Sequence, residues 1–514
     1  MPVETGTPLT TDPLTTDPPS TERPATGHRL DRPYLLLAGL FTVIGVAFAL
    51  RQPFSADLGV HAGTVERLRT SLTDPGDPLV GADIQSPYYS PYSVLLGVLA
   101  RLFGLSGVTT LAIAGPVVLV LLLWGLRAFV RTLTDRPLAP TLTLVFVLLL
   151  WGVKARLWSG FFSLWALPFV LAFPSTLALA LTLLLWAALA RTLDAPAHWL
   201  RYLGLGVLAA AVALIHPFTT VLAGLGALAL VANRVRRLPG AAWLALAIAT
   251  GEAAVLVEIW PYYSFRALFR ATGELDVVHH SLYHQPWLYY GMVVVALPAL
   301  WRRWRRDRLD PLVLLFVAAV VVVTVGALTG RYALGRVWPA VLLSGQVALG
   351  VELAGPLPRR LARIWLPVTA LACLAGVATQ AGNLLYLAPH SVTTPRVRAT
   401  ARMFVDWPDY RWLASYVKPG DVLLTDDYFA VRTVSAYGVR TIAPVWPDPF
   451  LPDAAQRQRD QATLVDPATN PTTRAGLLAR YRVRWVLEVP GGWRLPGNRD
   501  PVATGPRGQR LYRI

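Results

Sequence analysis

Residues 51–107 form the longest polar segment between strongly apolar runs, and they contain the strongest candidates for acid–base chemistry. Asp57 stands in ADLGVHAG, just after the first apolar run, and His61 follows one helical turn later. Burial near apolar walls raises the pKa of a carboxylate, so Asp57 can act as a general base toward a hydroxyl group. His61 can orient that base or bind a substrate. The alternatives are a helix N-cap for Asp57 and a surface position without a role for His61.

Asp83 is a second acidic candidate in the same segment. It lies in GADIQSPYYSPY, beside Tyr88, Tyr89 and Tyr92. Tyrosines next to an apolar run suit an aromatic belt at a membrane interface, and they also suit a platform on which a ligand stacks. We therefore keep Asp83 as a substrate-binding candidate.

Four cations flank apolar runs on a side that holds few other positive charges. Lys154 and Arg156 follow the third apolar run, and Arg331 and Arg336 stand in TGRYALGRVWP. Guanidinium groups match phosphate oxygens bidentately, so these residues are candidates for binding a phosphate. Snorkelling toward lipid headgroups is the competing interpretation.

Further polar residues interrupt apolar sequence. His216 precedes a proline in ALIHPFTTV, and such interruptions are tolerated where they line a cavity. Glu258, in VEIWPYYSFR, ends another apolar run, where ionisable residues are functional candidates. His280 and His284 have the i, i+4 spacing of metal ligands, but no carboxylate motif accompanies them. A plain hairpin turn and ordinary loop histidines explain the same patterns.

The composition identifies the scaffold around these residues. The chain has 514 residues, of which 54% are hydrophobic and 15% charged, and its mean hydropathy is +0.47. These values indicate an α-helical polytopic membrane protein. The single cysteine, Cys373, excludes a disulfide within the chain and a cysteine metal site.

Apolar runs of about 20 residues can cross a bilayer. On this criterion we predict about eleven transmembrane helices. They lie near residues 34–50, 108–127, 137–154, 164–190, 203–216, 217–232, 240–260, 286–301, 311–329, 336–355 and 364–385. Residues 91–105 are too short and carry Arg101, so we expect an amphipathic helix in the membrane interface.

The net charge of +17 is a topology signal. Arginines gather in connections on one side of the predicted helices: Arg127, Arg131, Arg136, Arg191, Arg201, Arg234, Arg236, Arg237, Arg302, Arg303, Arg305, Arg306, Arg308, Arg359, Arg360 and Arg363. The positive-inside rule makes this side cytoplasmic, which puts the N-terminus inside the cell membrane and the 51–107 loop outside it. The same placement argues against a nucleic-acid partner.

Both terminal segments differ from the membrane region, residues 33–385. Residues 1–32 hold few large apolar side chains, so we expect a disordered cytoplasmic tail. Residues 386–514 have a soluble composition, and RWLASYVKPGDVLLTDD and AGLLARYRVRWVLEV each indicate a helix followed by a strand. We therefore predict a small extracytoplasmic α/β domain there.

Several catalytic signatures are absent. The sequence has no P-loop, no GxGxxG after a strand, no HExxH and no GxSxG. ATP-driven pumps, Rossmann enzymes and the common hydrolases therefore have no support. The function classes that remain are chemistry on lipid-borne substrates and transport.

The chain resembles the GT-C superfamily of integral-membrane glycosyltransferases. The resemblance rests on one apolar run, then a loop that opens with an acidic residue and a histidine (ADLGVHAG), then YYSPYSVLLGVLARLFGLSG leading into the second run. In character it is nearest to actinobacterial cell-envelope mannosyl- and arabinofuranosyltransferases. Many members have two adjacent acidic residues, whereas here Asp57 is followed by Leu58.

The resemblance implies an inverting transfer at the outer membrane face. The sugar would pass from a polyprenyl-phosphate donor to a glycan, lipid or protein acceptor, with Asp57 as the base. Arg331 and Arg336 would stabilise the leaving phosphate, with Lys154 and Arg156 as second choices. A lipid-borne donor needs no nucleotide cofactor. Some branches use a divalent metal, which takes more than one acidic ligand, so a metal is only a possible cofactor here.

Two other functions stay open. A transporter or flippase of a lipid-linked saccharide would use the same outer cations, but such proteins are commonly built from repeated halves, and no convincing internal repeat is present. A polysaccharide polymerase or ligase usually carries its large outer loop later in the chain. Membrane lipids surround the protein in every case.

Overall fold

The computed structural model describes residues 31–51, 53–270, 272–389, 391–404, 407–497 and 499–514. The tail predicted to be disordered, residues 1–32, lies outside the described residues except at its last two positions. The helices of the first three quarters of the chain are α1 Arg32–Arg51, α2 Leu58–Thr70, α3 Pro91–Phe103, α4 Gly107–Leu133, α5 Ala139–Leu149, α6 Leu167–Val170, α7 Pro174–Asp194, α8 Trp199–Ile215, α9 Pro217–Arg234, α10 Gly240–Glu258, α11 Phe265–Arg270, α12 Thr272–His279, η1 His280–Tyr283, α13 Pro286–Tyr290, η2 Gly291–Ala296, α14 Leu297–Arg306, α15 Pro311–Thr329, η3 Tyr332–Val337, α16 Trp338–Leu353, α17 Arg359–Gln380 and η4 Gly382–Leu387.

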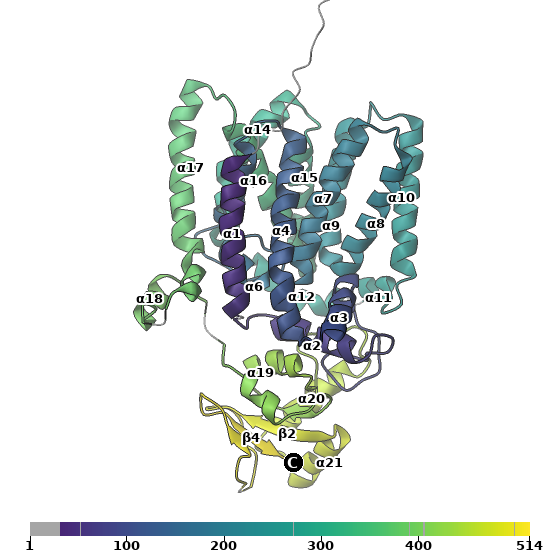
Figure 1. The fold of residues 1–514 in the computed structure, drawn as a ribbon, viewed down its shortest axis with the longest axis vertical. Coiled ribbons are helices and arrows are strands. Elements are labelled where there is room, and N and C mark those ends of the chain that lie inside the picture. The colour runs from purple at the N-terminus through teal and green to yellow at the C-terminus, as the bar shows by residue number, and fades with distance from the viewer. Residues whose placement is uncertain (1–30, 52, 271, 390, 405–406, 498) are drawn as a thin grey trace, which may run out of the picture.

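The long helices run side by side in one bundle, and the C-terminal segment lies beyond one end of it (Figure 1). Eight helices in the described ranges are long and apolar enough to cross a membrane: α1, α4, α7, α9, α10, α15, α16 together with η3, and α17. Their facing side chains form the largest hydrophobic core of the molecule. The prediction of a polytopic helical membrane protein is confirmed.

Two of the predicted spans take a different form. The span expected at 137–154 yields only α5, and the one at 286–301 is divided among α13, η2 and α14. The span expected at 203–216 forms one apolar helix, α8, which at 17 residues is shorter than the eight long helices. The span expected at 164–190 starts later, because α7 begins only at Pro174. Eight long helices are therefore observed within the described residues, and eleven crossings stay a prediction.

Side chains from distant helices stabilise the backbone where α5 ends. Gln346 donates a hydrogen bond to the carbonyl of Leu150 at 2.8 Å, and Thr379 donates one to the carbonyl of Gly152 at 3.2 Å. Buried carbonyl groups need such partners once a helix stops. Hydropathy does not reveal these partners, because it reads only local composition.

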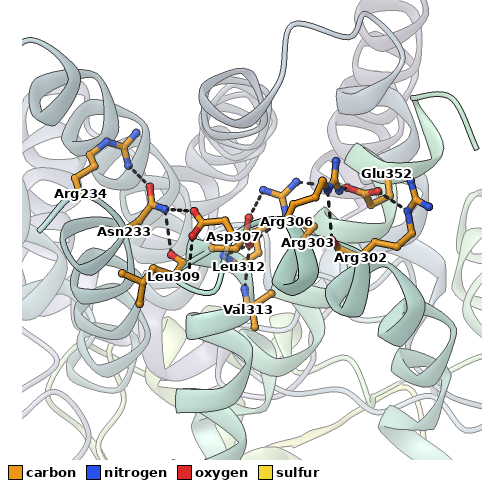
Figure 2. Close-up of polar contacts among 11 residues, drawn as sticks. Asn233, Arg234, Arg302, Arg303, Arg306, Asp307, Leu309, Leu312, Val313 and Glu352 are labelled. Carbon is orange, nitrogen blue, oxygen red and sulfur yellow. Dashed lines mark hydrogen bonds and ion pairs between the residues drawn. The ribbon is translucent and has the colours of Figure 1, made fainter. Parts of the chain in front are cut away.

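The end of the bundle opposite the C-terminal segment carries the arginine-rich connections (Figure 1). Figure 2 shows Arg302, Arg303 and Arg306 gathered around Glu352, which accepts from Arg302 Nε at 3.0 Å and forms an ion pair with Arg306. Arg303 also pairs with Asp310, the N-cap of α15. These three arginines are thus paired with carboxylates of the same chain.

The 51–107 loop folds into α2 and α3 at the other end of the bundle (Figure 1). Glu66 of α2 accepts a hydrogen bond from Gly107 N at 2.6 Å and so caps the start of α4. Gly97 of α3 packs on Leu68, where a Cβ at the glycine would lie 2.3 Å from the Leu68 Cβ. Residues 91–105 therefore contain the short helix that the sequence predicted.

The C-terminal segment is a small α/β unit. Its elements are α18 Pro395–Thr400, η5 Arg411–Ser415, β1 Val422–Leu424, α19 Tyr428–Thr433, η6 Val434–Tyr437, α20 Ala454–Val465, α21 Pro471–Arg480, β2 Val483–Glu488, β3 Ala503–Thr504 and β4 Arg510–Arg513. The sheet has the order β1-β2-β4-β3, with β1 parallel to β2 and β4 antiparallel to both of its neighbours. The two strands β1 and β2 lie where the sequence patterns predicted them.

Two glycines let this unit approach α2 closely. A Cβ at Gly59 would lie 2.0 Å from the carbonyl oxygen of Arg432, and one at Gly63 would lie 2.7 Å from the Cβ of Ser435. Ser435 Oγ also donates a hydrogen bond to the Gly59 carbonyl at 2.9 Å. The C-terminal unit therefore packs directly on the segment that carries Asp57.

Candidate active site

Asp57 stands in the turn between α1 and α2, where the bundle meets the C-terminal unit. Leu58 N donates to Ser55 O at 3.1 Å, and Ala56 has a φ of 46°. A residue with a Cβ is strained by about 1 kcal/mol in this left-handed region. Asp57 occupies the N-cap position of α2, but its carboxylate makes no capping hydrogen bond. The carboxylate is therefore directed to other partners.

Those partners are one hydrogen-bond donor and two cations. Trp446 Nε1, in a loop of the C-terminal unit, donates to Asp57 Oδ1 at 2.8 Å. Burial raises the pKa of Asp57, whereas the Trp446 hydrogen bond and the charges of Arg432 and Arg336 act in the opposite direction. A desolvated carboxylate that nearby cations help to keep ionised is in the environment that a general base requires.

Arg336, in η3, is held by two neighbours. Its Nη1 donates to the Ser159 carbonyl at 3.1 Å, and its Nη2 lies 3.0 Å from His216 Nε2. Because a guanidinium can only donate, His216 Nε2 is the acceptor of this contact, and His216 Nδ1 lies 2.7 Å from Thr219 Oγ1 and 3.3 Å from Thr219 N. His216 is thus a neutral imidazole that orients Arg336. Two residues that the sequence suggested separately are in direct contact.

A small pocket opens beside this pair. Its lining consists of Ser159, Gly160, Leu179, His216, Phe218, Thr219, Leu222, Arg336 and Pro339. The Arg336 guanidinium lies 4.9 Å from the centre of the Phe218 ring. Within the described residues Arg336 forms no salt bridge with a carboxylate, so its charge can act on a bound anion.

Arg432, in α19, is the second cation near Asp57. Its guanidinium stacks over the rings of Tyr428 at 3.7 Å and Trp446 at 4.6 Å. Nη1 donates to the Tyr428 carbonyl at 3.0 Å, whereas the buried Nε has no hydrogen-bond partner. Ring stacking fixes this guanidinium without cancelling its charge.

An apolar pocket adjoins the Asp57 turn. Its lining consists of Phe48, Ala49, Pro53, Leu58, Val108, Leu111, Ala112, Gly115, Pro168, Phe169, Leu171 and Ala172. These residues come from α1, α2, α4 and α6 and from the chain next to them. A hydrocarbon chain is the kind of ligand that such a lining favours.

His61 faces aromatic rings. Its ring centre is 4.6 Å from that of Phe173 and 6.1 Å from that of Tyr88. Burial lowers the pKa of His61 to about 4, so its side chain is neutral at pH 7. Tyr89 and Tyr92 are buried and donate to backbone carbonyl groups, so these two form neither an interfacial belt nor a stacking platform.

Lys154 and Arg156 join two loops of the bundle. Lys154 Nζ donates to Gln285 Oε1 at 3.2 Å, and Arg156 Nη1 donates to the Ser281 carbonyl at 2.5 Å. The Arg156 guanidinium also lies 4.1 Å from the centre of the Tyr289 ring. Neither residue is among the charges that shift the pKa of Asp57.

Three other predicted residues lie on exposed surface. Asp83 shares a hydrogen bond with the exposed Asp74, and Glu258 pairs with Arg266 at 2.8 Å while both side chains stay accessible. Arg331 is exposed just before η3. The structure therefore gathers Asp57, Arg336 and His216, and it leaves Asp83, Glu258 and Arg331 outside the charges that act on Asp57.

The donor set does not fit a divalent metal. Among the described residues, no group of three or more His, Cys, Asp or Glu side chains is placed to hold one. His280, the first of the predicted histidine pair, packs on the ring of Tyr332 at 4.5 Å. Around Asp57 the partners are an indole N–H and two guanidinium groups, which repel a cation.

Sequence reasoning missed Trp446 and Arg432. Trp446 lies 389 residues from the carboxylate to which it donates, so no local pattern links the two. The available signal was the glycine pair in LGVHAG, whose spacing marks a face that another backbone can approach.

Comparisons with known proteins bear on the fold. No protein-family model matches this chain, and no curated protein sequence does. The solved structure of the arabinofuranosyltransferase AftD from mycobacteria matches with a TM-score of 0.53 at 15% identity, over 93% of this chain and 40% of that one. The fold is GT-C-like.

A second group of solved structures is more distant. The oligosaccharyltransferase AglB from Archaeoglobus fulgidus, in complex with an inhibitory peptide and a dolichol-phosphate, matches with a TM-score of 0.48 at 12% identity, over 88% of this chain and 69% of that one. At 15% identity the match to the arabinofuranosyltransferase shows the fold of the chain alone. Its chemistry has to be argued from its own side chains.

Proposed function

We propose that this protein is an inverting glycosyltransferase that moves a sugar from a polyprenyl-phosphate donor to a glycan, lipid or protein acceptor of the cell envelope. The observation that carries the proposal is the position of Asp57. Its half-buried carboxylate lies near Arg336 and Arg432, and neither cation is neutralised by a salt bridge within the described residues. A base next to an anion-binding group is what transfer from a phosphate-linked donor requires.

In the proposed reaction, the acceptor hydroxyl oxygen attacks the anomeric carbon of the donor sugar. The bond between that carbon and the phosphate oxygen breaks, and the phosphate leaves with the electron pair. Asp57 takes the hydroxyl proton, while Arg336, oriented by His216, stabilises the charge that develops on the phosphate. Attack from the face opposite the leaving group inverts the anomeric configuration.

The apolar pocket suits the lipid part of the donor. It borders the Asp57 turn through Leu58 and Pro53, and its walls are aliphatic and aromatic. A polyprenyl chain held there would keep its phosphate near the loop that carries Asp57. The basic end of the bundle would face the cytoplasm and this site the outside, as the positive-inside rule predicts.

The test is a transfer assay on the purified full chain in nanodiscs. Wild type and Asp57→Asn are incubated with radiolabelled polyprenyl-phosphate sugars and envelope acceptors. We expect transfer by wild type and a loss of at least about 100-fold in the variant, because general-base catalysis contributes on this scale. The matched control is Asp74→Asn, which changes an exposed carboxylate of the same loop and should transfer like wild type.

Other outcomes would decide among the alternatives. Transfer that survives in Asp57→Asn would keep the enzyme class and reject Asp57 as the base. Absence of transfer from every donor, together with movement of a lipid-linked sugar across a liposome, would reject the enzyme and favour the transporter.

A further inference from the structure

The C-terminal unit is in direct contact with the chemistry-bearing loop. The C-terminal unit packs so closely on Gly59 and Gly63 of α2 that a Cβ at either position would clash with it. Thr441 N donates to the Leu79 carbonyl at 2.8 Å, which joins the two segments a second time. This docking carries the Trp446 indole to the Asp57 carboxylate.

We propose that the C-terminal unit completes the active site, with Trp446 as a positioning residue that fixes the Asp57 carboxylate and Arg432 as a second positioning residue, stacked on Trp446. The inference rests on the proposed function and adds two residues to it. It assigns the unit a role in the chemical step, beyond covering the site.

The geometry supports separate roles for the two oxygens of Asp57. The indole N–H occupies Oδ1, and no described donor is bonded to Oδ2. Oδ2 can therefore receive the acceptor proton while Oδ1 is held in place. A hydrogen bond to a carboxylate favours its ionised form, and so does a nearby guanidinium.

Two aromatic rings hold the Arg432 side chain in this position. Its guanidinium lies between the rings of Tyr428 and Trp446, so the same indole orders the cation and donates to the base. Removal of Trp446 would therefore disturb both interactions. Removal of the charge of Arg432 would remove the nearby cation and leave the indole hydrogen bond to Asp57 in place.

The experiment is the pH dependence of transfer in Trp446→Phe. Phenylalanine keeps an aromatic ring and removes the N–H donor, so the carboxylate should protonate more easily. We expect the acid limb of the rate profile to move up by about one pH unit, with the rate approaching that of wild type at higher pH. Arg432→Gln should shift the limb in the same direction.

The matched control is Trp407→Phe. Trp407 packs on Tyr428 and Phe429 in the same unit, and none of its ring contacts involves Asp57. Its profile should overlay that of wild type. A uniform loss of rate at all pH values in Trp446→Phe would indicate a merely structural tryptophan and would overturn the proposal.

A second readout needs no activity. Protonated carboxyl groups react with a carbodiimide and glycine ethyl ester, so mass spectrometry can follow modification of Asp57 against pH. Trp446→Phe should be modified up to a higher pH than wild type. Overlapping curves would overturn this inference even if transfer is observed, whereas a shifted curve without any transfer would reject only the proposed function.

Discussion

The two ends of the bundle hold arginines in opposite ways. At the basic end, Arg302, Arg303 and Arg306 surround Glu352, which is 2% exposed (Figure 2). At the end with the C-terminal unit, Arg336 and Arg432 bond to carbonyl groups and stack on aromatic rings. Contacts with uncharged groups hold both guanidinium groups in place while their charge is kept.

This difference separates structural cations from binding cations. A guanidinium that faces a carboxylate of its own chain offers little attraction to a further anion. One that is held by neutral groups keeps its electrostatic potential for a ligand or for charge that develops in a reaction. The number of arginines at one end is therefore a poor guide to function, and their partners are a better one.

The substitution Arg336→Gln should have the largest effect on transfer. Glutamine keeps a donor toward Ser159 but removes the charge from the pocket, so we expect transfer to fall by about 100-fold or more. Steady-state kinetics should show most of the loss in kcat. The control is Arg305→Gln, an exposed residue of the basic end, which should transfer like wild type. Equal effects of the two substitutions would contradict the distinction.

The converse test removes the central acid of the basic end. Glu352→Ala leaves the three arginines around it without their shared carboxylate, and breaking a buried ion pair costs about 3 kcal/mol of stability. We expect a lower melting temperature in detergent and an unchanged rate of transfer per folded molecule. A variant that keeps its stability but loses its rate would show that this end takes part in catalysis.

Much of the scaffold could be predicted because membrane solvation acts on local composition. The apolar run at 311–329 gave α15 with the same bounds, and the run at 34–50 gave α1 within two residues of its ends. The break after Leu149 could not be predicted, since it depends on partners such as Gln346 from a distant helix. Eight long helices and several interrupted ones result.

The candidate site was predicted only in part, for a related reason. Asp57, Arg336 and His216 are polar residues within or beside apolar sequence, and that contrast is visible locally. Trp446 and Arg432 lie in a segment of ordinary soluble composition, so nothing local distinguishes them. Only the docking of the C-terminal unit on α2 gives them a role.

The contact between the loop and the C-terminal unit contains a pair of carboxyl groups. Asp77 accepts from Leu79 N at 2.8 Å and Val80 N at 2.6 Å, and Asp448 accepts from Phe450 N at 2.8 Å. The charge of Asp77 acts on Asp448, so the two carboxyl groups lie close together. Burial, together with the negative charge of Asp77, raises the pKa of Asp448 to about 7.

The smallest expected effect follows from this pair. An aspartate in an unfolded chain has a pKa of about 4, so the folded form binds an extra proton between that value and about 7. The stability that this proton supplies is complete below about pH 4 and is lost as the pH rises through about 7. Asp448→Asn keeps a neutral donor to Asp77 at every pH, so its melting temperature should fall less than that of wild type between pH 5 and pH 8.

Between pH 5 and pH 8, the free energy of unfolding should fall more for wild type than for Asp448→Asn. The difference should be roughly 1 kcal/mol for each unit by which folding raises the pKa of Asp448. Asp500→Asn, an exposed carboxylate of the same unit, should retain the wild-type slope. Limited proteolysis of the C-terminal unit at the two pH values would locate the loss, because a weakened contact with α2 opens the segment that carries Trp446. Parallel melting curves for wild type and Asp448→Asn would show that the carboxyl pair does not hold the two segments together. In that case the glycine contacts of α2 would be the main basis of the docking that distinguishes this end of the molecule from the other.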